Sequence, residues 1–368
     1  MVGAIGLAVN SSAAWPYDVV SFSTHFGTSK QDWGNRITVD SVGNIYITGG
    51  TYGNLAAQNL GSVDSILVKC DSSGNVLWSQ QTGSKQLDYA GPVAVDAASE
   101  VYTINWCPSA CLSKYDGSGG KLWSQSIDHG DGTLAITTSG YAYTSASSYS
   151  VGTSLAKYDG AGINVWTQNV SPSRLGSVSV ASDAAGNAYI CGSDSGTTVI
   201  AKYDSAGGRL WAQRIGELGI TSMATDAAGN IYLGSGYDDE ANYLYKYSSS
   251  GHELWSSPLP WTCASLTANA SGSVCMLAYT KTFDHIAPDE TIFYDYDYIC
   301  VVFDENDYVN DLSANYVSGM ALDAAGNLYV TGMSNNDVFL TKYQVPEPAT
   351  LSLLAIGGFA MLRRRRKM

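Results

Sequence analysis

Charged residues are scarce in this chain of 368 residues, and those of positive sign are scarcest. Only 14% of the residues are charged, and 33 acidic residues face 19 basic ones, which gives a net charge of −14 at pH 7. Five of the basic residues stand in the last six positions, so the rest of the chain is more acidic still. A body of this charge repels phosphate backbones, which argues against nucleic acid as a partner.

Recognisable catalytic and zinc-binding spacings are also missing. The four histidines fall at unrelated positions, and no nucleophile is paired with a base by spacing. Cys107 and Cys111 are too far apart for a C-x-x-C half-site, and no second half-site lies nearby. We expect a local disulfide between these two, while cysteines in strand-like runs are expected to be small buried hydrophobes.

Glycine (39), tyrosine (25) and tryptophan (9) are plentiful, which favours short strands and tight turns over amphipathic helices. One unit of the form V-x-V-D-x-x-G-N-x-Y-x-x-G recurs seven times. The residues at its first turn position are Asp40, Asp96, Thr137, Asp183, Asp226, Asn269 and Asp323. Intervals of 41 to 56 residues match propeller blades better than helical solenoids.

A second unit, such as AKYDSAGGRLWAQ, alternates with the first, and each unit has two alternating runs around a D-x-x-G turn. That pattern is typical of a β-hairpin, so two hairpins per repeat predict a four-stranded blade. Small residues two positions before the marker predict that the first strand is innermost. The recurring tryptophans then fall on the outermost strand as packing residues; they are Trp78, Trp123, Trp166, Trp211 and Trp255.

The two ends of the body complement each other. The last repeat stops at LTKYQ without its tryptophan strand, while SFSTHFGTSKQDW near the N-terminus is similar to LWSQQTGSKQLDY, with Phe22 at the Trp78 position. The sequence therefore predicts an all-β fold over residues 18–344. It is a seven-bladed β-propeller of four-stranded antiparallel blades, closed by the N-terminal strand, because closure removes exposed sheet edges.

The alternation of DYAGPVAVDAASEVY with ILVKCDSSGNVLWSQQTG resembles the propeller repeat of bacterial secreted proteins known as the SBBP repeat. This resemblance implies a fold but no single activity.

Residues 345–368 resemble the PEP-CTERM sorting signal of Gram-negative bacteria, with a proline motif, a short apolar run and a basic cluster. The motif residues are Pro346, Glu347, Pro348, Arg363, Arg364, Arg365 and Arg366. The apolar run predicts a short hydrophobic helix of roughly 20 Å, too short for a durable membrane anchor. The resemblance implies an exosortase-type processing enzyme, transient contact with the inner membrane, and a final place at the cell surface or in the extracellular matrix. The alternative is an ordinary C-terminal anchor.

Residues 1–17 are a candidate signal peptide, with a short apolar run and the small residues Ser12, Ala13 and Ala14. No lysine or arginine precedes the apolar run, so only part of the usual pattern is present.

One acidic insert, FDHIAPDETIFYDYDYICVVFDENDYVND, breaks the pattern between the fifth and sixth repeats. In an extended strand Asp295 and Asp297 lie on one side, which makes them candidate ligands for Ca²⁺. The alternative is a solvated acidic loop. No other cofactor is expected.

The sequence favours a non-enzymatic binding or structural protein of the cell surface or of an extracellular polysaccharide matrix. The alternative is a lyase or hydrolase that acts on a glycan or small molecule at the mouth of the central channel, where loops converge.

Overall fold

The computed structural model describes residues 20–344, apart from 107–108, 128–129, 195–196, 217–218, 237–241, 260–261, 271, 273, 287–291, 304–307 and 312–315. All regular structure in this part of the chain is β-strand, and it includes no helix long and apolar enough to cross a membrane.

The strands form seven four-stranded antiparallel sheets. Blade 1 consists of β2 (Asp32–Val39), β3 (Ile45–Thr51), β4 (Asp64–Cys70) and β5 (Val76–Thr82). Blade 2 consists of β6 (Tyr89–Val95), β7 (Val101–Trp106), β8 (Ala110–Tyr115) and β9 (Lys121–Ser126). Blade 3 consists of β10 (Gly130–Ile136), β11 (Ala142–Ser148), β12 (Gly152–Tyr158) and β13 (Asn164–Ser171).

Blade 4 consists of β14 (Gly176–Ser182), β15 (Ala188–Asp194), β16 (Thr197–Tyr203) and β17 (Arg209–Ile215). Blade 5 consists of β18 (Ile220–Thr225), β19 (Ile231–Ser235), β20 (Asn242–Tyr247) and β21 (Glu253–Leu259). The irregular sheet consists of β22 (Thr262–Ala268), β23 (Val274–Ile286), β24 (Ile292–Phe303) and β25 (Tyr308–Asp311). The closing blade consists of β26 (Tyr316–Leu322), β27 (Leu328–Ser334), β28 (Asp337–Tyr343) and β1 (Val20–Phe26).

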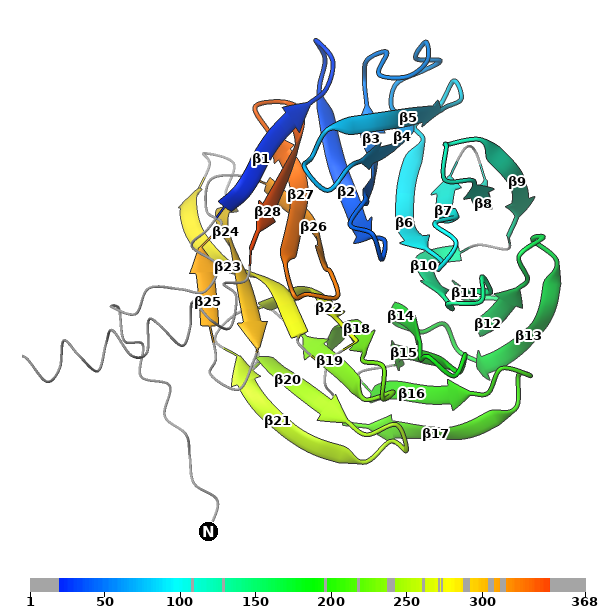
Figure 1. Ribbon diagram of the computed structural model, residues 1–368. Coiled ribbons are helices and arrows are strands. Elements are labelled where there is room, and N and C mark those ends of the chain that lie inside the picture. The colour runs from blue at the N-terminus through cyan, green and yellow to red at the C-terminus, as the bar shows by residue number, and fades with distance from the viewer. Residues whose placement is uncertain are drawn as a thin grey trace, which may run out of the picture.

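The sheets stand around a central axis, with the first strand of each nearest the centre and the fourth at the rim (Figure 1). The innermost strands contact one another in sequence around a complete ring, from β2 through β6, β10, β14, β18 and β22 to β26 and back to β2. The prediction that the first strand is innermost is therefore confirmed.

The hydrophobic core lies between neighbouring sheets rather than inside any one of them. One cluster, for example, joins Tyr189 and Ile200 of blade 4 to Met223 and Leu233 of blade 5. Because strands alternate their side chains between two faces, every blade contributes to the cluster on either side of it. Each blade is thus stabilised only in the presence of its neighbours.

The predicted fold class needs two corrections. The sequence predicted seven equivalent blades, whereas the structure has six regular blades, whose strands have five to eight residues. The remaining sheet is irregular, because β23 has 13 residues, β24 has 12 and β25 only 4. The acidic insert therefore lies inside this sheet, where it lengthens the central hairpin, and not between two blades. The predicted C-terminal helix has no support either, since the described residues contain none and residues 345–368 lie outside them.

Closure by the N-terminal strand is confirmed. β1 pairs antiparallel with β28, and this pairing places Phe22 opposite Lys342. The same register places Trp78 opposite Lys69 in blade 1, so Phe22 occupies the tryptophan position as the sequence predicted. Without β1, the edge of β28 would be left open to pairing with other molecules.

Deleting residues 1–28 is expected to expose that edge and give an aggregation-prone product with a lowered melting temperature. Deleting residues 1–14 removes nothing of β1 and should leave the melting temperature unchanged. Size-exclusion chromatography and thermal unfolding of the two truncated chains check this. A monomeric 1–28 deletion with the melting temperature of the intact chain would contradict the role of β1.

Candidate ligand clefts between the blades

A repeated pair of hydrogen bonds ties each of blades 1 to 4 to the next blade. In blade 1, the Lys69 Nζ and Trp78 Nε1 atoms donate to the same carbonyl oxygen, that of Gly117 in blade 2, at 3.0 and 3.1 Å. The two side chains are cross-strand neighbours on β4 and β5. We call this arrangement the lysine–tryptophan latch.

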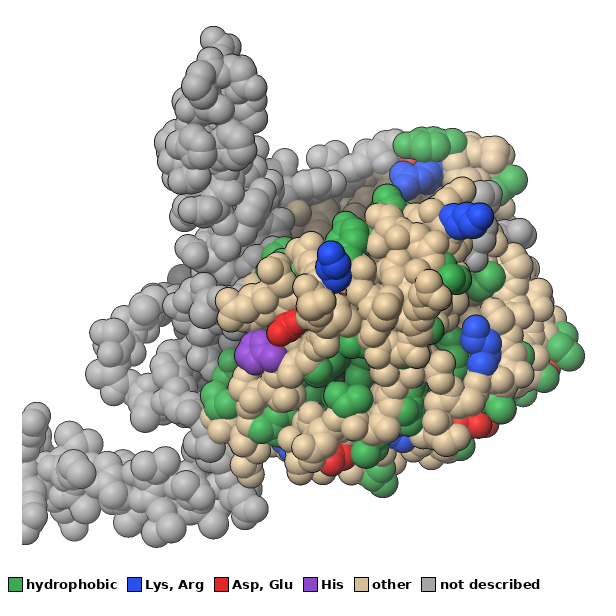
Figure 2. All heavy atoms as spheres, turned by 90° about the horizontal axis from the view of Figure 1, so that it is seen from above, with side chains coloured by type: hydrophobic (Ala, Val, Ile, Leu, Met, Phe, Trp, Pro, Cys, Tyr) green, Lys and Arg blue, Asp and Glu red, His purple; other side chains and the backbone are tan. Residues whose placement is uncertain are grey.

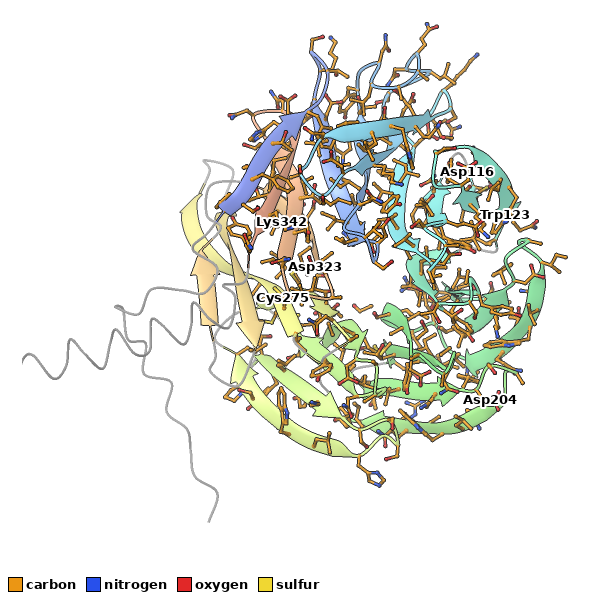
Figure 3. The ribbon with its side chains drawn as sticks, viewed as in Figure 1. Asp116, Trp123, Asp204, Cys275, Asp323 and Lys342 are labelled. Atoms are coloured by element: carbon orange, nitrogen blue, oxygen red, sulfur yellow. The ribbon has the colours of Figure 1, made fainter. Side chains whose placement is uncertain are left out.

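The latch recurs at three further seams. Lys114 and Trp123 donate to Gly160, Lys157 and Trp166 to Ser205, and Lys202 and Trp211 to Ser249. Each tryptophan ring also covers the positive-φ glycine of the turn that it reaches; a Cβ on Gly119 would lie 2.9 Å from the Trp78 ring. Figure 3 shows Trp123 on the outer side of blade 2. The prediction of tryptophans as packing residues on the outermost strands is confirmed for these four.

The turn aspartates anchor the inner hairpin turn of their own blade. Asp183 accepts hydrogen bonds from the Asn187 side chain and the buried Tyr189 hydroxyl, and its carboxylate lies 3.4 Å from the Lys202 Nζ atom. Burial alone would raise the pKa of Asp183, but the Asn187 and Tyr189 hydrogen bonds and the Lys202 charge hold the pKa below its ordinary value. The D-x-x-G-N pattern is thus explained by turn geometry and tyrosine anchoring.

The seam between the closing blade and blade 1 has a weaker latch. Phe22 packs against Gly74 of blade 1 as the tryptophans pack at the other seams, but phenylalanine has no N–H to donate. We expect Phe22→Trp to add a bond to the Ser72 carbonyl, which corresponds to that of Gly117, and to stabilise the fold by about 1 kcal/mol. Thermal unfolding measures the change. Trp211→Phe is the matched control and should lower stability by a similar amount, whereas a destabilised Phe22→Trp would show that this seam has no room for the indole.

The lowered pKa of Asp183 predicts a pH dependence of stability. A carboxyl group whose pKa is depressed by folding contributes stability above its unfolded pKa, about 3.9, and loses it as the pH falls through the folded pKa. Asp183→Asn should therefore be less stable than the parent at pH 7, and the difference should shrink below about pH 4. Melting temperatures of both chains between pH 7 and pH 2 check this, and a constant difference would refute it.

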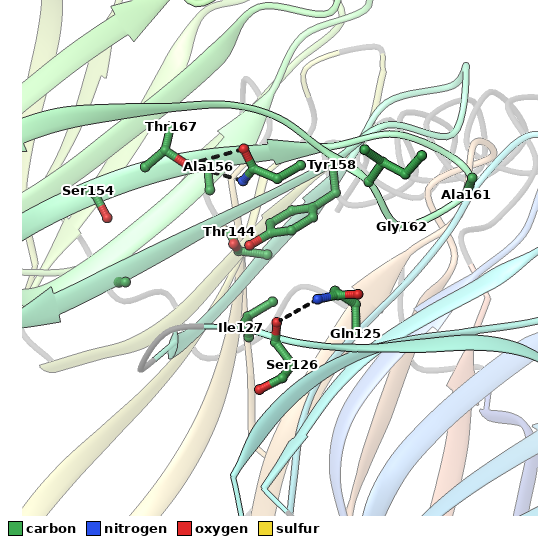
Figure 4. A pocket seen from close by; sticks show the side chains of 13 residues that line it. Gln125, Ser126, Ile127, Thr144, Ser154, Ala156, Tyr158, Ala161, Gly162 and Thr167 are labelled. Atoms are coloured by element: carbon green, nitrogen blue, oxygen red, sulfur yellow. Dashed lines mark hydrogen bonds between the residues drawn. The ribbon is translucent and has the colours of Figure 1, made fainter.

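An open cleft of about 600 Å³ lies between blades 2 and 3. One wall is formed by Gln125, Ser126 and Ile127 at the end of β9, and the other by residues of β11, β12 and β13 with the turn between the last two. Those of the second wall are Thr144, Ala146, Ser154, Ala156, Tyr158, Ala161, Gly162, Ile163, Asn164 and Thr167. Figure 4 shows the Tyr158 ring between the strand that carries Gln125 and the strand that carries Thr167.

Small side chains create this cleft. Counted back from the latch lysine, Ser154 and Ala156 of β12 correspond to Tyr243 and Tyr245 of β20. In blade 5 those two rings and Tyr247 form a stack with centroid distances of 5.6 and 6.4 Å, which fills the space. In blade 3 only Tyr158, the counterpart of Tyr247, remains. At the Ala156 position blades 2 and 4 also carry small residues, Ser113 and Ala201. The departure from the repeat is therefore Ser154, which stands where blades 1 and 4 have Ile66 and Val199.

The part of the cleft lining that the structure describes is largely polar and carries no charge. Gln125 Nε2 donates to the Ser126 carbonyl at 3.3 Å, and Asn164 Nδ2 donates to the Thr167 hydroxyl at 3.1 Å. An amide can make several hydrogen bonds as donor and acceptor, so both side chains retain capacity for a ligand. None of the 13 lining residues is Asp, Glu, His, Cys, Lys or Arg. The cleft suits a neutral ligand rich in hydroxyl groups.

The residues proposed for Ca²⁺ lie in the irregular sheet. Asp295 and Asp297 are on β24, paired with Thr282 and Thr280 of β23, so they share one face of that hairpin. Their side chains are outside the described part, and the Ca²⁺ site stays a prediction. The described residues contain no group of three His, Cys, Asp or Glu side chains that could hold a metal ion.

The expected Cys107–Cys111 disulfide is wrong for Cys111, which is a free thiol; Cys107 is outside the described residues. Cys70, Cys191 and Cys263 are buried thiols, and burial raises their pKa to about 12. They are small core residues, as predicted for strand cysteines. The sorting residues Pro346 to Pro348 and Arg363 to Arg366 lie outside the described part.

The ring of four-stranded sheets defines the chain as a β-propeller, and comparisons with known proteins agree. A solved structure titled "Structure of Dos1 propeller" superimposes with a TM-score of 0.54 at 11% identity, covering 90% of this chain and 98% of that one. This likeness concerns the fold alone. No curated protein matches the sequence.

Two family models match the chain and confirm both resemblances. The SBBP model, "Beta-propeller repeat", matches residues 22–56 and 308–339, and the "PEP-CTERM protein-sorting motif" matches residues 344–367. The chain thus contains segments that match the SBBP repeat near both ends of the propeller, followed by a match to the PEP-CTERM motif, which indicates an exported protein.

The cleft between blades 2 and 3 was missed in the sequence. The signal that could have found it is Ser154, a small residue at a position where blades 1 and 4 have Ile66 and Val199, with Ala156 two residues further along the same strand. Repeat comparison finds such a difference, but only the strand register shows that both residues face one seam.

Proposed function

We propose that this protein is an exported, non-enzymatic binding module whose cleft between blades 2 and 3 holds a neutral segment of an extracellular polysaccharide. The observation that carries the proposal is the described lining of that cleft, in which hydroxyl and amide groups surround the ring of Tyr158 and none of the 13 described residues is charged. Hydroxyls and amides match the donors and acceptors of a sugar, and a ring offers an apolar face.

The lining also favours binding over catalysis. General acid–base catalysis of glycoside cleavage uses a pair of carboxyl groups, and acid–base chemistry in general uses His, Asp, Glu, Lys, Tyr or Cys. Among the described lining residues Tyr158 is the one side chain of these types, and its ring is buried between the walls. A lone phenol supplies no acid–base pair.

The sorting motif supports a role outside the cell. We infer that an exosortase-type enzyme processes the chain at its PEP-CTERM region after transient residence in the inner membrane, and that the propeller is then displayed at the cell surface or in the matrix. A module there meets polysaccharide at high local concentration, so weak binding in an open cleft is sufficient.

The test fills the cleft without adding charge. Ser154→Tyr places in blade 3 the residue that blade 5 carries at the same position, and it should abolish binding of neutral oligosaccharides by the full-length chain on a glycan array. The melting temperature should change little, because Tyr243 shows that the repeat accommodates this ring.

Ser23→Tyr is the matched control, since it adds the same ring to β1 on the outer side of the closing blade and should leave binding intact. Equal binding by the parent chain and Ser154→Tyr would remove the cleft from the proposal. Release of reducing ends from a bound glycan would favour the alternative of a lyase or hydrolase at the channel mouth.

A further inference from the structure

A second cleft, of about 370 Å³, lies between blades 3 and 4 and differs from the first in charge. Its blade 3 wall is formed by Val170, Ser171 and Pro172, and its blade 4 wall includes Arg209 and Arg214 of β17. Both arginines are exposed, and both belong to the outermost strand of blade 4. The cleft thus brings two guanidinium groups to the rim of an acidic protein.

Arginine is rare in the body of the chain. Before residue 345 the sequence contains four arginines, Arg36, Arg174, Arg209 and Arg214, against ten lysines. Four of the lysines serve in latches between blades. Two of the four arginines, by contrast, line one cleft, where no latch requires them.

Neither of the two cleft arginines has all of its hydrogen-bond donors engaged by other residues of the fold. Arg214 forms a single 3.3 Å contact with Asp194, and its side chain remains 59% exposed. An exposed ion pair of this kind contributes little to stability, about 0 to 1 kcal/mol. Arg209 takes part in none of the ion pairs among the described residues, and its neighbour across the strands is the phenol of Tyr203. Both guanidinium groups therefore have donors left for a ligand.

From this arrangement we propose that the cleft between blades 3 and 4 binds the anionic groups of an acidic polysaccharide, carboxylate or sulfate, through Arg209 and Arg214. The proposal rests on the proposed function, since it takes a polysaccharide as the ligand and assigns its acidic residues to this cleft. The guanidinium fork matches the two oxygens of a carboxylate or sulfate better than an ammonium group does.

The distance between the two arginines favours an oligosaccharide over a single sugar as the ligand. Five residues along an extended strand separate their Cα atoms by roughly 16 Å. One sugar acid reaches a single guanidinium, while acidic groups on separate residues of one chain reach both. An oligosaccharide that contacts both arginines binds more tightly than one that contacts a single arginine, because the second contact forms within the complex.

The two clefts lie on either side of blade 3. Thr167 of β13 lines the neutral cleft, and Val170 of the same strand lines the basic one. A polysaccharide with both neutral and acidic residues therefore finds complementary sites at neighbouring seams of the rim. Figure 2 shows that charged side chains are sparse and scattered over the face in view, so such a site contrasts with its surroundings.

The experiment measures binding of the full-length chain to an oligogalacturonate, to its methyl ester and to dextran sulfate, with neutral dextran as reference. We expect the charged polymers to bind at least about tenfold more tightly than the uncharged ones, and Arg209→Gln and Arg214→Gln each to lower that affinity about tenfold. Added salt should weaken the binding. Arg174→Gln is the matched control, because Arg174 lies near the same seam over the ring of Tyr149 and does not line the cleft.

Tight binding of the oligogalacturonate alone identifies uronate as the source of charge, and tight binding of dextran sulfate alone identifies sulfate. Equal affinity for charged and uncharged polymers, or an equal loss in Arg174→Gln, overturns the proposal. So does monomeric galacturonate that competes as well as the oligomer. Neutral oligosaccharides that bind the parent and not Ser154→Tyr, without any arginine dependence, would leave the proposed function standing and remove this inference alone.

Discussion

The fold depends on one carbonyl oxygen at each latched seam. This oxygen belongs to the outer turn of a blade and accepts hydrogen bonds from a lysine and a tryptophan of the preceding blade, as the Ser205 oxygen does from Lys157 and Trp166. A carbonyl oxygen has two acceptor positions, so both donors are satisfied together. The tryptophan ring then covers a glycine of the same turn, because only a residue without Cβ leaves that space. The hydrogen bonds and the ring packing of the latch thus hold neighbouring blades in a single position relative to each other.

This dependence explains how much of the fold could be predicted from the sequence. Lysine, turn glycine and tryptophan recur because every latch needs all three. The alternating runs around D-x-x-G turns predicted the hairpins, and the small residues before the marker placed the tryptophans on the outermost strand. The closing strand was predicted by the same logic, since Phe22 keeps the ring that covers Gly74 although it lacks the donor. The irregular sheet could not be predicted. Its long hairpin replaces the repeat over β23 and β24, and a degenerate pattern does not specify whether extra residues lengthen strands or join blades.

The clefts could not be predicted for a different reason. A repeat pattern reports what the blades share, whereas a binding site in a propeller arises where one blade differs. Ser154 and Ala156 are unremarkable strand residues until the register places them opposite the end of β9. Arg209 and Arg214 likewise stand among ordinary β17 residues, and only the fold turns them toward a cleft shared with β13. Asp295 and Asp297 were chosen because alternation along an extended strand puts them on one side, and alternation within one strand does not locate a cleft between blades.

Lysine and arginine have different roles in this protein: the latch lysines stabilise the fold, and the cleft arginines remain available to a ligand. A lysine in a latch is buried along its stem and delivers its ammonium to one carbonyl, as Lys69 does, and it lies over the ring of Tyr46 on the way. The ammonium group of lysine, a single rotatable charge, suits that task. The planar guanidinium group of an arginine would leave donors unpaired inside the seam. Arginine at an exposed rim has the opposite advantage, because its remaining donors face solvent until a ligand with several oxygens arrives. Since the latches bury lysines at the seams, positive charge available to a ligand is confined to a few exposed positions, and two of these share one cleft.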